Sequence, residues 1–150
     1  MPVHAPLISF AAALAAADPT VSHFTGTDAQ ARPPLLRLDG DGNWTQTSTG
    51  TALLQYVEAL QASKQAAAET AAVADELRRY QKFAPPGRPP LLIVQLRQQQ
   101  ARAKQAALVA GQALSQASAT LLRELKLHAP TRQAPAPWLA NWLNAHLPRE

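Results

Sequence analysis

Oxygen-bearing side chains alternate through the stretch DGDGNWT with the spacing of the first ligands of a calcium-binding loop. These residues are Asp39, Asp41, Asn43 and Thr45. A complete loop of this kind also needs glycine at its sixth position and a bidentate glutamate at its twelfth. Those positions hold Trp44 and Gly50. The stretch is therefore expected to form a glycine-rich turn, and no metal ion or cofactor is predicted for the chain.

No other group of residues predicts catalysis. The chain has no cysteine, which excludes thiolate chemistry and disulfides. Its histidines are scattered, and none has a partner at metal-ligand spacing on the same face; they are His4, His23, His128 and His146. No serine lies in a nucleophile motif and no glycine-rich phosphate loop occurs. We expect a protein that is not an enzyme and that has no small-molecule substrate.

Basic residues gather where the two long helices predicted below would reverse direction. They are Arg78, Arg79, Lys82, Arg88, Arg97, Arg102 and Lys104. Cations favour helix C-termini, which explains the first three but not Arg88 or Arg97, which lie at the start of the next helix. The cluster predicts contact with phosphates or with an acidic protein partner, and plain solvation is the alternative. No aromatic residues interleave with the charges, so base-specific recognition is not expected.

The segment WLANWLNAHL places large apolar residues on one side of a short amphipathic helix over 138–147. These residues are Trp138, Leu139, Trp142, Leu143 and Leu147. Tryptophan is enriched at binding hot spots, so this helix is a candidate anchor for a partner. It could equally fold back onto the rest of the chain, because the proline-rich link before it permits either arrangement.

Two long helices are predicted to position the basic cluster, over about 51–83 and about 91–128. Apolar and small residues recur in each at spacings of three and four. In the first they are Leu53, Tyr56, Leu60, Ser63, Ala67, Thr70, Ala74 and Leu77; in the second they are Ile93, Leu96, Gln100, Ala103, Ala107, Ala110, Leu114, Ala117 and Leu121. Thr51 is the expected N-cap, and APPGRPP separates the helices. Folding the chain back about Gly87 sets Ala67 opposite Ala107 and Tyr80 opposite Val94, which predicts an antiparallel hairpin.

The first 50 residues form a different kind of segment. The apolar run at the N-terminus has no basic residue ahead of it, so it predicts a short helix that ends before Asp18 rather than a signal peptide. A small β-hairpin is predicted over about 34–49, with Gly40 and Gly42 supplying positive φ and alternate threonines on one strand face. No stretch is long and apolar enough to span a membrane.

These elements predict a mainly α protein. Residues 1–150 are expected to form a single elongated domain, made of an arm (1–50), the helical hairpin (51–128) and the proline-rich link with the tryptophan helix (129–150). The 47% of hydrophobic residues is largely alanine. Because alanine buries little area, we expect an elongated helical molecule, or one that completes its core in an oligomer.

The pentapeptide RPPLL occurs at Arg32 and again at Arg88. The sequences that follow the two copies diverge at once, so both are interpreted as punctuation. Proline stops the preceding element and presets φ for the next one.

The shape favours a structural subunit of a homo-oligomeric assembly. A phage virion or a similar particle is the expected setting, as a ring, connector or shell accessory, because the bias toward Ala, Gln, Arg and Pro is typical of high-GC bacteria and their phages. The alternatives are a nucleic-acid-associated accessory protein of a bacterial mobile element, and an adaptor or inhibitor that docks through the tryptophan helix. The expected location is the virion or the bacterial cytoplasm.

Overall fold

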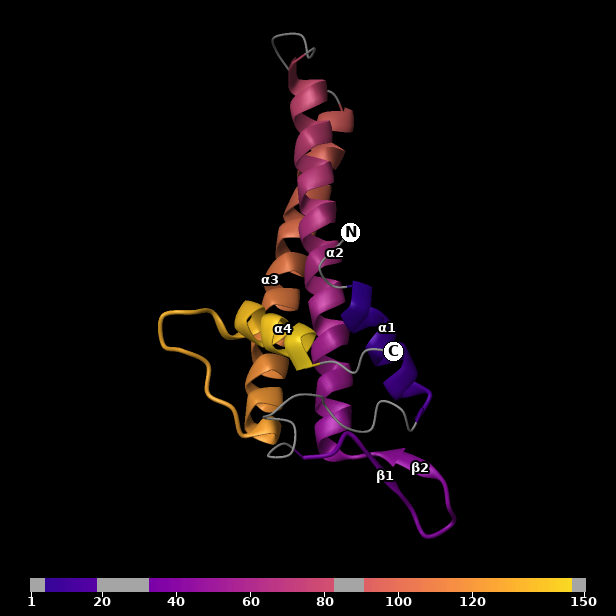
Figure 1. The fold of residues 1–150 in the computed structure, drawn as a ribbon. Helices are drawn as coiled ribbons and strands as arrows, with labels where there is room; N and C mark the ends of the chain where they lie inside the picture. Colours follow the sequence, from indigo (N-terminus) through magenta and orange to yellow (C-terminus); the bar gives the residue numbers. More distant parts are fainter. Residues whose placement is uncertain (1–4, 19–32, 83–90, 147–150) are drawn as a thin grey trace. The chain divides into compact units, whose positions relative to one another are not determined.

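The computed structural model describes residues 5–18, 33–82 and 91–146. The chain is mainly α, as predicted, with four helices and one small antiparallel sheet in these segments (Figure 1). The elements are α1 (Ala5–Ala15), β1 (Leu36–Leu38), β2 (Trp44–Gln46), α2 (Ser48–Lys82), α3 (Leu91–Leu125) and α4 (Pro135–His146). Helices α2 and α3 run side by side in opposite directions, which confirms the predicted hairpin.

By their internal contacts the residues divide into two compact units. Unit 1 comprises Met1–Glu58 and Leu114–Glu150, and unit 2 comprises Ala59–Ala113. Both boundaries fall inside the long helices, because α2 and α3 each contribute residues to both units.

Unit 1 contains a core of large side chains drawn from every helix, from the residue before β1 and from the first residue of β1. The fully buried ones are Leu7, Leu14, Leu35, Leu36, Leu53, Tyr56, Leu121, Leu125, Leu139 and Leu143. In α1 the buried residues Leu7, Phe10, Ala11 and Leu14 recur at helical spacing, which explains why this apolar run forms an amphipathic helix. Burial of each large side chain stabilises the unit by roughly 1.5–3 kcal/mol before the entropy of ordering is counted.

The β-hairpin lies within the predicted range but is shorter. Leu36 pairs with Gln46, Arg37 with Thr45 and Leu38 with Trp44. Thr47 and Thr49 do not extend the strand face, contrary to the prediction. Thr49 already lies in α2, because the helix begins as soon as the second strand ends.

Thr47, not Thr51, is the N-cap of α2. Its hydroxyl accepts a hydrogen bond from the amide of Gly50 (3.2 Å) and donates one to the carbonyl of Pro34 (2.6 Å). Such a cap satisfies one of the amides that a helix leaves unbonded at its start. The sequence pattern misplaced the start because Gly50 resembles a turn residue, yet it lies in the first helical turn.

Gly50 is required there by a close approach of two chain segments. A Cβ added at this position would lie 2.2 Å from the carbonyl oxygen of Leu35. That oxygen also accepts a hydrogen bond from the amide of Thr47 (3.0 Å), so it is held in place. Only glycine fits where the chain before β1 crosses the first turn of α2.

Both α1 and α3 end in the same type of C-terminal cap. After α1, Ala17 has a positive φ of 57°, and the amides of Ala17 and Asp18 bond back to the carbonyls of Leu14 and Ala13. After α3, Lys126 (φ 56°) and Leu127 repeat this arrangement. This Schellman motif ends α3 at Leu125, three residues before the predicted His128, because a left-handed residue cannot continue the helix.

In unit 2 the predicted stripe is confirmed along α3. None of its stripe residues from Ile93 to Ala110 is exposed. The hydroxyl of Thr70 lies 3.3 Å from the carbonyl oxygen of Ala103, which fixes the register within one residue of the predicted one. Two details were wrong. Ala66 is buried instead of Ala67, and Tyr80 and Val94 are exposed, since the cluster at that end is formed by Leu77, Ile93 and Leu96.

Gly50→Ala tests the close approach at the start of α2. We expect it to lower the free energy of unfolding by about 2 kcal/mol or more, because the new methyl group meets fixed backbone. Gly111 is the matched control: it lies inside α3 with nothing within 4 Å of an added Cβ. Gly111→Ala should instead stabilise by about 0.5–1 kcal/mol, because alanine favours helix more than glycine does. Thermal unfolding followed by circular dichroism measures the stability of both variants. A Gly50→Ala protein as stable as the wild type would contradict the close approach of Leu35 to Gly50.

Candidate functional site

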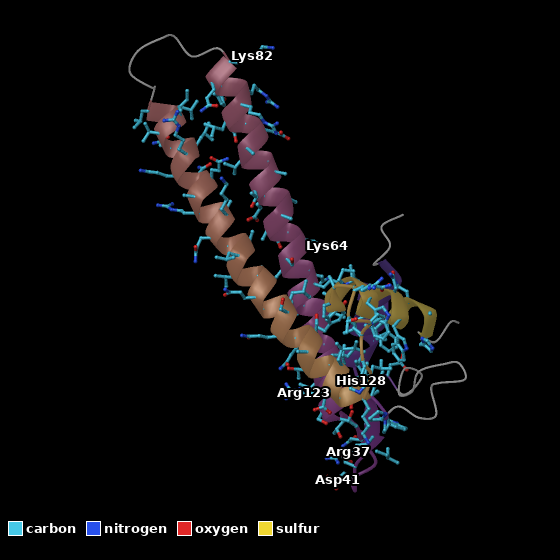
Figure 2. All side chains as sticks on the ribbon, turned by 90° about the vertical axis from the view of Figure 1, so that its left-hand side faces the viewer. Arg37, Asp41, Lys64, Lys82, Arg123 and His128 are labelled. Carbon is cyan, nitrogen blue, oxygen red and sulfur yellow. The ribbon has the colours of Figure 1, made fainter. Side chains whose placement is uncertain are left out.

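The turn of the β-hairpin uses the carboxylate that could have bound calcium. Asp39 Oδ1 accepts hydrogen bonds from the amides of Asp41 and Asn43, both at 2.9 Å. Gly42 supplies the positive φ (83°), whereas Gly40 does not, contrary to the prediction. Asp41 projects from this turn (Figure 2). Asp39 therefore stabilises its own turn, and the described segments contain no group of three or more His, Cys, Asp or Glu residues that could hold a metal ion.

A polar hollow of about 400 Å³ lies beside the start of α2 in unit 1. Its lining residues are Pro33, Ser48, Thr49, Thr120, Arg123, Glu124 and Lys126. Helix α2 has no acidic residue in its own first turn, and Ser48 Oγ donates a hydrogen bond to Glu124 Oε2 of α3 (3.0 Å). A carboxylate at a helix N-terminus is favoured by the helix dipole. Glu124 thus places a carboxylate of α3 beside the start of α2.

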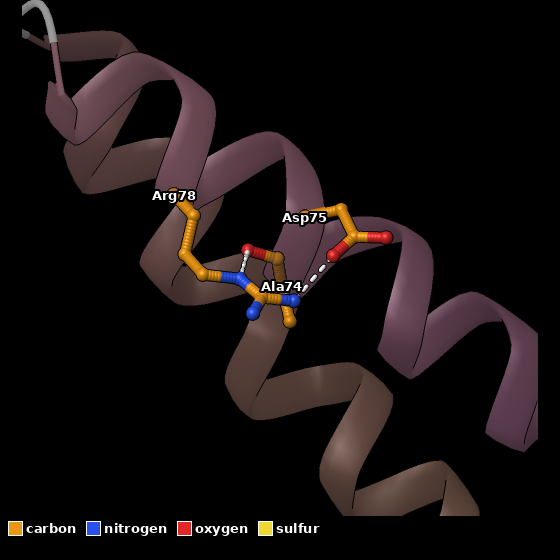
Figure 3. Close-up of polar contacts among 3 residues, drawn as sticks. All are labelled: Ala74, Asp75 and Arg78. Atoms are coloured by element: carbon orange, nitrogen blue, oxygen red, sulfur yellow. Dashed lines mark hydrogen bonds and ion pairs between the residues drawn. The ribbon is translucent and has the colours of Figure 1, made fainter.

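The six basic-cluster residues in the described part of the chain are all exposed. They are Arg78, Arg79, Lys82, Arg97, Arg102 and Lys104; Arg88 lies outside the described residues. Lys82 stands at the C-terminal end of α2 (Figure 2). Arg78 forms an ion pair with Asp75, and its Nε lies 3.4 Å from the carbonyl oxygen of Ala74 (Figure 3). This exposed pair adds little stability, since water screens both charges.

Helical geometry divides these charges between two sides of the hairpin. Arg78, Arg97 and Lys104 each follow a residue of the buried stripe by one position, after Leu77, Leu96 and Ala103. In an antiparallel pair of right-handed helices, this offset points to the same side on both helices. We name Arg78, Arg97 and Lys104 the basic flank. Arg102 does not belong to it, because it precedes Ala103 and so lies on the opposite side.

The opposite side of unit 2 carries an apolar groove. Its walls are Ala62, Arg102, Gln105, Ala106, Val109, Ala110 and Ala113, which we name the alanine groove. Glu69 and Glu76 lie on the same side, since each precedes a stripe residue by one position, as Arg102 does. The sequence analysis did not predict this groove. The sequence did contain a sign of it. Positions 102, 106, 109 and 113 recur at spacings of three and four, which marks a second stripe on α3 beside the buried one.

The tryptophan helix begins three residues earlier than predicted and packs within unit 1. Leu139 and Leu143 are fully buried, whereas Trp138 and Trp142 are half-buried; Leu147 lies outside the described residues. The ring of Trp142 stacks on His146 at 4.2 Å, and His146 Nδ1 lies 2.8 Å from the carbonyl oxygen of Trp142. The two leucines thus contribute to the chain's own core. An anchoring role for the tryptophans stays a prediction.

Tyr56 joins α2 to α4 through a buried hydrogen bond. Its hydroxyl donates to the carbonyl of Ala136 at 2.7 Å, and its side chain has no exposed surface. Burial raises the pKa of the Tyr56 phenol from 10.0 to about 12, because the phenolate would lose its hydration. The sequence placed Tyr56 on the helix stripe but gave no sign of its partner, which lies 80 residues away.

The raised pKa predicts a loss of stability in alkali. Between pH 10 and 12 the phenol ionises in the unfolded chain but stays protonated in the folded one. The free energy of unfolding should therefore fall through this window, by about 2–3 kcal/mol once the pH exceeds both pKa values. Urea unfolding of the wild type and of Tyr56→Phe across this range measures the effect. The free energy of unfolding of Tyr56→Phe should fall less between pH 10 and 12 than that of the wild type. An equal fall in the two proteins would contradict a raised pKa for Tyr56.

Taken together, the described residues of unit 2 offer two exposed surfaces, the basic flank and the alanine groove. None of the helices in these residues is long and apolar enough to cross a membrane. Comparison of the chain with protein-family models, with curated proteins and with solved structures finds no match.

Proposed function

We propose that the chain is a non-catalytic structural subunit of a homo-oligomeric assembly. The observation that carries this proposal is the uneven distribution of exposed apolar residues. Eight large apolar side chains are exposed in the described segments, and six of them lie in unit 2. These six are Tyr80, Leu91, Leu92, Val94, Leu108 and Val109. An excess of exposed large apolar side chains on one unit is what an unpaired contact surface would leave there.

The buried part of unit 2 is small by comparison. Its buried apolar residues are Leu60, Ala66, Leu77, Ile93 and Leu96. A pair of helices with so few large buried residues gains little from packing, and isolated helices are only marginally stable in water. Association with other copies would add the missing burial. A ring, connector or shell accessory of a phage virion or a similar particle fits this requirement and the compositional bias of the chain.

The oligomeric state is the first test. Sedimentation velocity on the full chain at increasing concentration should show a species of two or more copies. Because association stabilises the folded state by mass action, the melting temperature should also rise with protein concentration. A chain that stays monomeric and well folded at high concentration would contradict the proposal.

The basic flank supports a second candidate, an accessory protein that binds nucleic acid without reading its sequence. Arg97 and Lys104 form no ion pair with any described residue, and Glu69 and Glu76 lie on the opposite side. Asp75, which follows the stripe residue Ala74 by one position, lies on this flank and is paired with Arg78. Arg97 and Lys104 therefore carry the charge that phosphates could meet. Exposed cations that meet phosphates release counterions, so such binding weakens steeply as salt rises.

Fluorescence anisotropy with a labelled DNA duplex tests this candidate. Changing Arg78, Arg97 and Lys104 together to glutamine should abolish most of the binding. The slope of log affinity against log salt should also become shallower, by about one for each phosphate that the variant no longer neutralises. Arg102→Gln is the matched control from the other side and should change the affinity little. Absence of salt-dependent binding by the wild type, or equal losses of affinity in both variants, would contradict this candidate.

A further inference from the structure

The alanine groove is an open depression of about 600 Å³ between Ala62 of α2 and six residues of α3. Its walls are mostly small side chains, and Val109 leaves 53% of its surface exposed beside them. Small residues let the backbone of another helix approach closely, at interaxial distances of about 8–10 Å. The small wall residues and the open form of the groove therefore suit the packing of a helix.

The groove side continues toward the end of the hairpin with further apolar surface. Leu92 precedes the buried Ile93 by one position and Tyr80 follows Leu77 by three, so both lie on the groove side. They expose 41% and 42% of their surfaces. An occupant as long as the hairpin itself would cover both the groove and these two side chains.

Charge on this side is arranged in a self-complementary way. The acidic residues, Glu69 and Glu76, belong to α2, and the basic one, Arg102, belongs to α3. The hydrogen bond from Thr70 to Ala103 shows that these two residues lie at about the same height along the helix axes. Glu69 and Arg102, which precede them, therefore also lie at about the same height. If a second hairpin lies on the first, related by a twofold axis parallel to the helices, α2 of each copy covers α3 of the other. Arg102 of each copy then meets Glu69 of the other.

We propose that the alanine groove seats the helical hairpin of a second copy of this chain, with Arg102 of each copy paired to Glu69 of the other in a four-helix arrangement. This inference rests on the proposed oligomeric function and specifies its contact. The self-complementary charges favour a copy of the chain over other occupants. The carboxylates of Glu69 and Glu76 would repel nucleic acid from this side, and the neutral glutamines Gln95 and Gln99, which lie on it by their spacing from Arg102, suit an interface depleted of charge.

A charge-swap series tests the pairing. The variants are Glu69→Arg, Arg102→Glu and the double variant, studied as full chains by sedimentation equilibrium. Each single change sets like charges against each other twice in the dimer, so self-association should weaken by about tenfold or more. The double variant restores opposite charges across the interface and should recover affinity to within about threefold of the wild type. Arg97→Glu on the basic flank is the matched control and should leave self-association unchanged.

The outcomes separate this inference from the function it rests on. If the wild type associates but the single variants associate equally well, or if the double variant is no better than the weaker single one, the groove is not the contact and the oligomeric function stands without it. If the wild type remains monomeric, both are overturned, and the groove is left to a helix of another protein. Circular dichroism of each variant confirms that any loss of association occurs in folded chains.

Discussion

The small area that an alanine side chain can bury is the constraint on which this structure depends. Alanine favours helix and allows two helices to approach closely, but each buried methyl group contributes only about a third of what a leucine contributes. In unit 2 the facing stripes consist largely of alanine and other small residues, so the hairpin forms readily while gaining little from its own packing. The stability of such an element must come from what lies against it.

Unit 1 shows how the same chain behaves where large side chains are available. Leucines from all four helices, from the residue before β1 and from the first residue of β1 are fully buried together. Several polar groups there form hydrogen bonds within the unit: the Tyr56 hydroxyl, the Thr47 cap and the Ser48 hydroxyl with Glu124. The contrast between a leucine-rich unit and an alanine-rich one assigns different roles to them. Unit 1 encloses most of its large apolar side chains, whereas unit 2 leaves six of its own exposed.

The sequence predicted the parts of the fold that depend on periodicity. Spacings of three and four marked the long helices and the face that each buries, and matching the two stripes gave the antiparallel register within one residue. The ends of the elements could not be predicted, because they depend on contacts distant in sequence or on rare backbone conformations. Glycine is needed at position 50, inside α2, because the carbonyl of Leu35 crosses there, and α3 stops early because Lys126 adopts a positive φ. The candidate surfaces were likewise predicted only in part. The basic residues could be found from the sequence, but their division between two sides of the hairpin became clear only once the two helices were packed together.

The central claim is that the hairpin of unit 2 is completed by another copy of the chain. Amide hydrogen exchange measured across a wide range of protein concentration tests it most directly, because exchange reports the local stability of each segment separately. The account predicts that amides in 59–82 and 91–113 become more protected as concentration rises, while the core amides of unit 1 change little. Protection in the hairpin that is already as strong in dilute solution as in concentrated solution would contradict it.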